Sequence, residues 1–147
     1  MNNNEVISIL NGLVESCKRG QEAFRGAAEG IRNSEFRRLF NIFAQQRTQF
    51  ISELQSEIHR LGGDTGQGAP TTARADNTIP FRLPTTPEIR DEAAIIAECQ
   101  QEEEMAVNDY QEALKADLPL DVQYVVKRQY MDIKDAYDRI RILQRAA

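Results

Sequence analysis

The segment GGDTGQGAPTTARADNTIPFRLPTTP, residues 62–87, decides the fold that this sequence predicts. It is rich in glycine, proline and threonine and has no apolar period, whereas the chain on both sides of it has strong helical periodicity. An extended connection of about 25 residues reaches ~80 Å. A turn between neighbouring antiparallel helices needs far fewer residues. The segment therefore predicts a connection that runs the whole length of a helical bundle.

Apolar residues recur at steps of three and four on either side of this segment, which predicts four helices of about 25 residues, each ~40 Å long. Asn4, Ser34 and Thr86 are the predicted N-cap residues, and Gly62 is the predicted glycine after the second helix. The expected bounds are 4–31, 34–61, 87–115 and 119–145 for the helices, about 62–86 for the crossover, and 1–147 for a single domain.

The remaining two connections are short, one at Arg32-Asn33 and one around Asp117 and Pro119. Each flanking pair of helices is therefore predicted to form an antiparallel hairpin. Two such hairpins joined by a long crossover make an all-α four-helix bundle of ferritin-like arrangement.

Composition limits the class of protein. The chain has 147 residues, of which 41% are hydrophobic and 28% charged, as expected of one soluble domain with one core. No apolar run approaches the ~20 residues of a membrane span, and the N-terminus lacks the pattern of a secretory signal, so a cytoplasmic location without a membrane partner is expected. A net charge of -5 with dispersed basic residues disfavours nucleic-acid binding.

The two cysteines and one histidine are too few for the usual Cys/His zinc site. Cys17 and Cys99 lie on predicted core stripes at different heights in the bundle, so they are predicted to be buried and not joined by a disulfide.

Polar residues interrupt the apolar stripes of the four predicted helices near their middles. The clearest case is FAQQRTQF, residues 43–50, where Gln-Gln-Arg separates large apolar residues. Positions on the four stripes that lie at similar distances from the two short turns meet at one height in an antiparallel bundle. The sequence therefore predicts a central polar layer. Its candidate members are Gln21, Gln46, Arg47, Gln49, Glu103, Asp132 and Asp135.

Ferritin-like enzymes place their metal ligands at this height, with a Glu from each of two helices and a Glu-x-x-His from each of the other two. Where Glu-x-x-His would be expected, this sequence has QRTQ at 46–49 and DIKD at 132–135. Arg47 together with Glu103 and Asp132 would form an ionic cluster of the kind that a buried carboxylate needs. The favoured interpretation is therefore a structural layer without metal or another cofactor.

Two alternatives stay open for this layer. One is an iron or manganese site, whose candidate ligands are Glu103, Asp132, Glu22 and Glu104. The other is a layer built from different residues, because the assumed register of a helix is shifted.

Three stretches resemble a known group of proteins: SILNGLVESCKRGQEAFRGAAEGI (8–31), LFNIFAQQRTQFISELQSEIHRLGG (39–63) and AIIAECQQEEEMAVNDYQEALKADLP (94–119). They resemble bacterial four-helix-bundle proteins of unknown function in the ferritin-like superfamily, which are distant relatives of rubrerythrins and mini-ferritins. The resemblance implies the fold and a bacterial source, but no established reaction. The sequence departs from the group's pattern at Gln21, where an acid is expected, and in the proline-rich stretch TIPFRLPTTP (78–87).

These observations favour a non-catalytic, self-associating bundle. A stress-related role would come only from the relatives. One alternative is a di-metal carboxylate protein that handles oxygen, peroxide or iron, and another is a helical docking module that presents TIPFRLPTTP to a protein partner. Apolar residues outside the core stripes, among them Ile42, Tyr124, Tyr130 and Met131, favour a homodimer.

Overall fold

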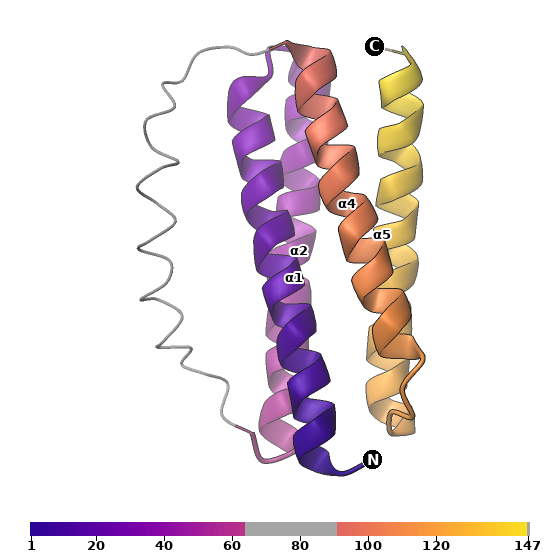
Figure 1. Ribbon diagram of the computed structural model, residues 1–147. Helices are drawn as coiled ribbons and strands as arrows, with labels where there is room; N and C mark the ends of the chain where they lie inside the picture. The colour runs from indigo at the N-terminus through magenta and orange to yellow at the C-terminus, as the bar shows by residue number, and fades with distance from the viewer. Residues whose placement is uncertain (64–90, 147) are drawn as a thin grey trace.

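The computed structural model describes residues 1–63 and 91–146, and these residues form four long α-helices. They are α1 (Asn3–Gly30), α2 (Ser34–Arg60), α4 (Glu92–Leu114) and α5 (Leu120–Ala146). The helices lie side by side along one direction, and α1 with α2 and α4 with α5 form antiparallel hairpins (Figure 1). α2 ends at the end of the bundle opposite to the one where α4 begins (Figure 1). The predicted all-α four-helix bundle of two hairpins is confirmed.

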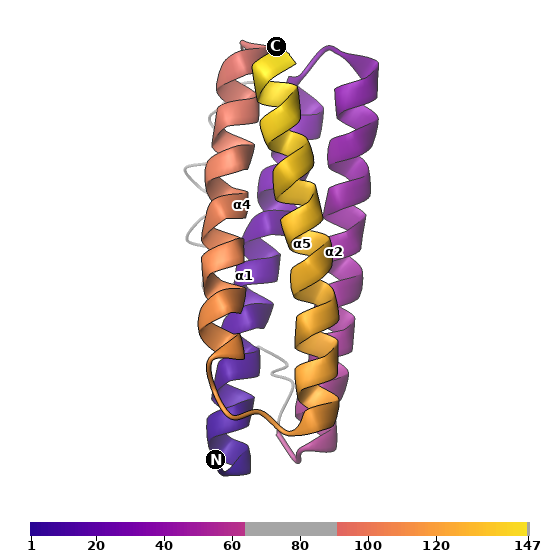
Figure 2. The same cartoon turned by 90° about the vertical axis from the view of Figure 1, so that its right-hand side faces the viewer.

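The order of the helices around the bundle follows from their contacts. α1 packs against α2 and α4, whereas α5 packs against α4 and, less extensively, against α2. α1 and α5 are therefore diagonal neighbours, as are α2 and α4. The outer side of α5 faces the viewer in Figure 2, and no other described helix lies over it.

The N-terminus of α1 differs from the predicted one. Asn2, rather than Asn4, is the N-cap: its side chain accepts a hydrogen bond from the Glu5 amide at 2.8 Å. The Glu5 carboxylate in turn accepts from the Asn2 amide at 2.9 Å, which completes a capping box. The box needs an acid or amide three residues after the cap, and only Asn2 has Glu5 at that distance.

The N-terminus of α2 is also shifted by one residue. Asn33, rather than Ser34, is the N-cap, because its backbone is extended and its side chain accepts from the amides of Glu35 and Phe36. The C-terminal end follows the prediction, since Gly62 comes directly after the C-cap Leu61 and has a φ of 89°.

The predicted cap at Thr86, the predicted start of the third helix at residue 87, and the crossover beyond residue 63 lie outside the described residues. Within them, α4 begins after Asp91, whose backbone is extended. None of the helices in the described part of the chain has both the length and the apolar character that a membrane span requires.

The core consists of two apolar clusters, one toward each end of the bundle. The first contains Phe50, Tyr110, Val126 and Ile133, and the second contains Phe24, Phe40, Phe43 and Ile96, with the neighbours of each. On α2 and α4 the boundary between the clusters falls at Arg47 and Glu103. The centre of the bundle is therefore the place where polar side chains are buried.

Candidate functional site

A buried ion pair joins α2 and α4 at the boundary of the two clusters. Arg47 Nη2 donates to both carboxylate oxygens of Glu103, and both side chains are 0% exposed. Arg47 points inward because it lies four residues after Phe43 and three before Phe50, on the same helical stripe. Glu103 takes the equivalent place on α4 between Cys99 and Ala106. Two full charges are thus held together away from water.

The rest of the Arg47 side chain is enclosed by α1 and α2. Its Cζ lies 5.4 Å from the centre of the Phe24 ring and 5.9 Å from that of Phe50, so the guanidinium has an aromatic face on two sides. Its Nη1 donates to Gln46 Oε1 at 3.2 Å. Gly20 provides the space on α1, because a Cβ there would lie 3.1 Å from Arg47 Nε. Gly20 is therefore part of the site, although the predicted polar layer did not include it.

Burial has the largest effect on the pKa of Glu103 in this ion pair. Burial raises the pKa of the Glu103 carboxyl above its ordinary value of 4.5, and the attraction and hydrogen bonding of Arg47 offset only part of this rise. The loss of hydration thus outweighs the attraction between the two charges, as is common for buried ion pairs. Each partner therefore depends on the other to stay in the core.

A second group of buried polar side chains lies next to the pair. The Tyr110 hydroxyl donates to Gln129 Oε1 at 2.6 Å, and Cys17 Sγ lies 3.2 Å from the same hydroxyl. Because the hydroxyl proton is directed to Gln129, the Cys17 thiol donates to the tyrosine oxygen. Burial raises the pKa of Cys17 and, more strongly, that of Tyr110, so both groups keep their protons at neutral pH.

Gln129 extends this group to the surface. Its Nε2 donates to the Phe50 carbonyl at 3.3 Å and to Glu53 Oε1 at 2.9 Å, and Glu53 also pairs with Arg128 at 3.0 Å. Hydrogen bonds thus connect α1, α4, α5 and α2 in turn. We call Arg47, Glu103, Cys17, Tyr110 and Gln129 together the central polar cluster.

The structure brings together only part of the layer that the sequence predicted. Gln46 is half-buried beside Arg47, and Gln21 is half-buried and donates to the Thr48 hydroxyl between α1 and α2. Asp132 is half-buried, whereas Gln49 and Asp135 are exposed. Gln49 and Asp135 therefore lie outside the buried centre.

On α5 the predicted stripe was wrong in its middle part. The sequence pattern placed Val122, Val125, Asp132, Ala136 and Ile140 on it, but the buried residues are Val122, Val126, Gln129, Ile133, Ala136 and Ile140. Their alternating steps of four and three residues were visible in the sequence, and they would have identified Gln129 as the inward polar residue.

Residues 5–116 match the model of a protein family described as a domain of unknown function, DUF2383. The chain belongs to the DUF2383 family. No curated protein matches it. The sequence-based expectation of a family of unknown function is thus confirmed.

A solved structure places this DUF2383 chain among known folds. It is the crystal structure of a two-domain protein from Anabaena variabilis ATCC 29413 that contains DJ-1/ThiJ/PfpI-like and ferritin-like domains. The similarity has a TM-score of 0.79 at 16% sequence identity and covers 99% of this chain. This chain spans 37% of that protein, so the likeness concerns the fold alone. The fold of this DUF2383 chain is ferritin-like, as the sequence predicted.

The residues at the centre do not fit the di-metal site of ferritin-like enzymes. Glu22 and Glu104 are exposed, Asp132 is half-buried, and both oxygens of Glu103 accept from Arg47. Over residues 1–63 and 91–146, no three His, Cys, Asp or Glu side chains converge as metal ligands would. A divalent cation at Glu103 would also face the fixed positive charge of Arg47.

Proposed function

We propose that this chain is a non-catalytic ferritin-like bundle, in which an internal arginine occupies the central position that metal ions take in ferritin-like enzymes. One observation carries the proposal: Arg47 engages both carboxylate oxygens of Glu103, and neither side chain is exposed. An arginine side chain cannot be deprotonated in a protein, so Glu103 has a permanent cation beside it.

In this proposal the central polar cluster fixes how the helices pack. Apolar side chains alone tolerate several registers between helices, whereas a buried charged or hydrogen-bonded group is satisfied in only one. The network from Cys17 through Tyr110 and Gln129 to Glu53 supports this role, because it involves each described helix once. The function then lies on the outer surface, in binding to another molecule.

Two other expectations are not part of the proposal. The docking hypothesis for TIPFRLPTTP concerns residues outside the described ranges. A stress-related role came from the resemblance to relatives, and no feature of the described helices points to it.

The test is the metal content of the untagged, full-length protein, measured by elemental analysis. It is determined as purified, and again after incubation with ferrous iron or with manganese followed by removal of free metal. We expect far less than stoichiometric metal in each case. The Glu103→Ala, Asp132→Ala double variant is the control, and it should give the same background. Near-stoichiometric metal that this variant loses would overturn the proposal in favour of a di-metal carboxylate protein.

A further inference from the structure

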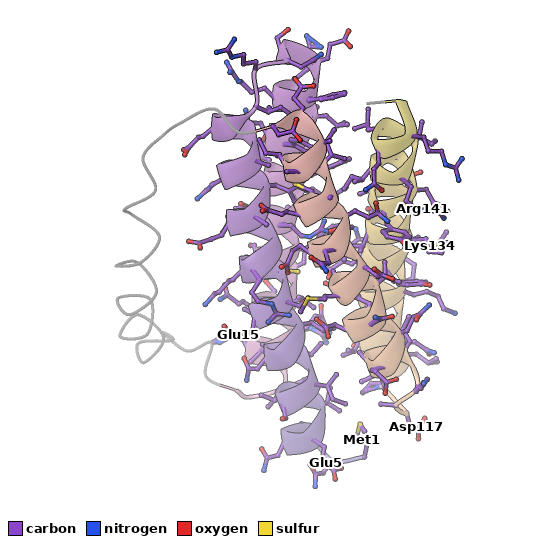
Figure 3. The ribbon with its side chains drawn as sticks, turned by 45° about the horizontal axis from the view of Figure 1, so that its top comes forward. Met1, Glu5, Glu15, Asp117, Lys134 and Arg141 are labelled. Carbon is purple, nitrogen blue, oxygen red and sulfur yellow. The ribbon has the colours of Figure 1, made fainter. Side chains whose placement is uncertain are left out.

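The outer face of α5 carries a row of exposed apolar side chains. Leu120, Tyr124, Met131 and Ile142 are 82%, 68%, 63% and 62% exposed. At ~100° per residue, this row lies on the side of α5 opposite to its buried stripe. α5 lies at the edge of the bundle in Figure 3, where Lys134 and Arg141 are labelled on it. Among residues 1–63 and 91–146, no helix covers the row, so it is an unpartnered helix face within the described part of the chain.

The regular spacing of these residues aligns their side chains along the axis of α5. Leu120, Met131 and Ile142 are separated by equal steps, and each step is about three helical turns of ~3.6 residues. These three side chains therefore lie almost one above another over ~33 Å of helix. The exposed residues Tyr124, Lys127, Asp135 and Asp138 fill the turns between them. We call these seven residues the α5 row.

The α5 row is complementary to itself when reversed about Met131. Leu120 and Ile142 lie at equal distances on the two sides of Met131, and so do Lys127 and Asp135. Tyr124 and Asp138 form the third such pair. The two residues of each pair can interact favourably. The first pair is apolar with apolar, the second is a cation with an anion, and the third is a phenol with a carboxylate.

We propose that the α5 row binds a second copy of this chain, with the two α5 helices antiparallel and Met131 on the two-fold axis. Leu120 then packs on the partner's Ile142, Met131 on the partner's Met131, and Lys127 lies against the partner's Asp135. Such a contact is isologous, which is the usual form of a homodimer interface. This inference goes beyond the proposed function and does not depend on whether the centre binds metal.

Charge complementarity selects the antiparallel arrangement of two copies. A parallel pair in register would place Lys127 on Lys127 and Asp135 on Asp135, which is repulsive. Asp135 and Asp138 already pair within α5, with Arg139 at 3.2 Å and Lys134 at 3.9 Å. These pairs are exposed and weak, so the two carboxylates remain available to a partner. Contact through one helix of each copy is small, which gives a weak dimer.

The test is sedimentation equilibrium of the full chain, over concentrations that extend into the high micromolar range. Lys127→Glu and Asp135→Lys each place like charges opposite one another at two symmetric points, and we expect each to weaken self-association by roughly tenfold or more. A mixture of the two variants should associate again. In the mixed dimer the introduced glutamate faces the introduced lysine, and the native Lys127–Asp135 pair remains at the other point.

Matched controls change charge on other exposed positions. Lys115→Glu and Glu104→Lys lie outside α5 and should associate as the wild type does. Circular dichroism of each variant verifies that the helices are retained. A wild-type chain that stays monomeric over the whole range would overturn the proposal, and would leave the row to a partner of different chemistry. A dimer that neither charge reversal weakens, or that the mixture does not restore, would equally overturn it.

A cross-linking experiment tests the position of the axis. In a Met131→Cys variant the two introduced thiols meet at the two-fold axis, and mild oxidation should convert the protein to a disulfide-linked dimer. Cys17 and Cys99 are buried, so the native thiols contribute little background. Glu104→Cys, on the exposed side of α4, is the control and should cross-link much more slowly. Equal rates for the two variants would contradict an axis at Met131.

Discussion

At the scale of single residues, the buried Arg47–Glu103 ion pair is the feature of the bundle centre on which stability depends most directly. Removing one member of a buried ion pair leaves an uncompensated charge, which costs about 3–5 kcal/mol. We therefore expect Arg47→Met and Glu103→Leu to destabilise the fold by that amount each. The double variant should recover most of the loss, because an apolar pair needs no hydration. Urea denaturation followed by circular dichroism measures all four proteins, and a double variant as unstable as the sum of the singles would show that the pair is not coupled.

The raised pKa of Glu103 gives stability a pH dependence of known sign. Between the ordinary value of 4.5 and the raised value, folded Glu103 holds a proton that the unfolded chain has released. The free energy of unfolding therefore falls as the pH rises through this window, by at most about 1.4 kcal/mol per pH unit. The stabilisation that Glu103 contributes is fully present below the pKa that its carboxyl has in the unfolded chain. It is lost above the raised pKa that the carboxyl has in the folded protein.

Glu103→Gln removes this titration while keeping the size of the side chain. We expect the difference in unfolding free energy between wild type and variant to change with pH across the window, with the wild type losing stability relative to the variant as the pH rises. Urea denaturation of both proteins in a series of buffers measures the difference. Parallel pH profiles would show that Glu103 titrates as an exposed glutamate does.

At the scale of the element, the sequence predicted α1, α2 and α4 better than α5. On α2 the polar interruption between large aromatic residues placed Gln46 and Arg47 in the predicted layer, but it left open whether Arg47 points inward or outward along the helix. The structure buries Arg47 completely and Gln46 only in part. On α5 both Val125 and Val126 are apolar, and two neighbouring residues point ~100° apart. Choosing Val125 turned Gln129 outward and Asp132 inward in the prediction. Periodicity therefore predicts that a helix is amphipathic, but adjacent apolar residues leave its orientation open.

Sequence patterns could not predict the contacts between helices, because such a contact joins residues that lie far apart along the chain. The pairing of Tyr110 with Gln129 joins two helices, and neither residue marks the other along the chain. Likewise, Gly20 is significant only because Arg47 of another helix approaches it.

The glycines of α1 provide a prediction at this scale. Alanine is favoured over glycine in a helix by about 1 kcal/mol when nothing opposes it. A Cβ at Gly12 or Gly26 meets nothing within 4 Å, whereas one at Gly20 would crowd Arg47 Nε at 3.1 Å. We expect Gly12→Ala and Gly26→Ala to raise the free energy of unfolding, and Gly20→Ala to raise it less or to lower it. Thermal and urea denaturation measure the three variants, and an equal gain at Gly20 would mean that Arg47 moves aside without cost.

At the scale of the whole molecule, the Arg47–Glu103 pair lies between the two apolar clusters, and Cys17 and Tyr110 adjoin it on the side of the first cluster. Hydrogen bonds from Cys17 to Tyr110, from Tyr110 to Gln129, and from Gln129 to Phe50 and Glu53 tie the four described helices together at this level. Because any opening of one end would leave these buried groups unsatisfied, the two ends should be coupled.

The two cysteines report on this coupling, since Cys17 belongs to one apolar cluster and Cys99 to the other. Both thiols are buried, so a thiol reagent reaches each only when its surroundings open. We expect Cys17 and Cys99 to be labelled slowly and with the same opening free energy, equal to that of global unfolding. Cys99→Ala and Cys17→Ala variants isolate each thiol, and each rate is compared with the urea stability of the same variant. Each opening free energy is first corrected for the stability of its own variant. A remaining difference of more than about 1 kcal/mol between Cys17 and Cys99 would mean that the two ends of the bundle open separately. The central polar cluster would then not couple them.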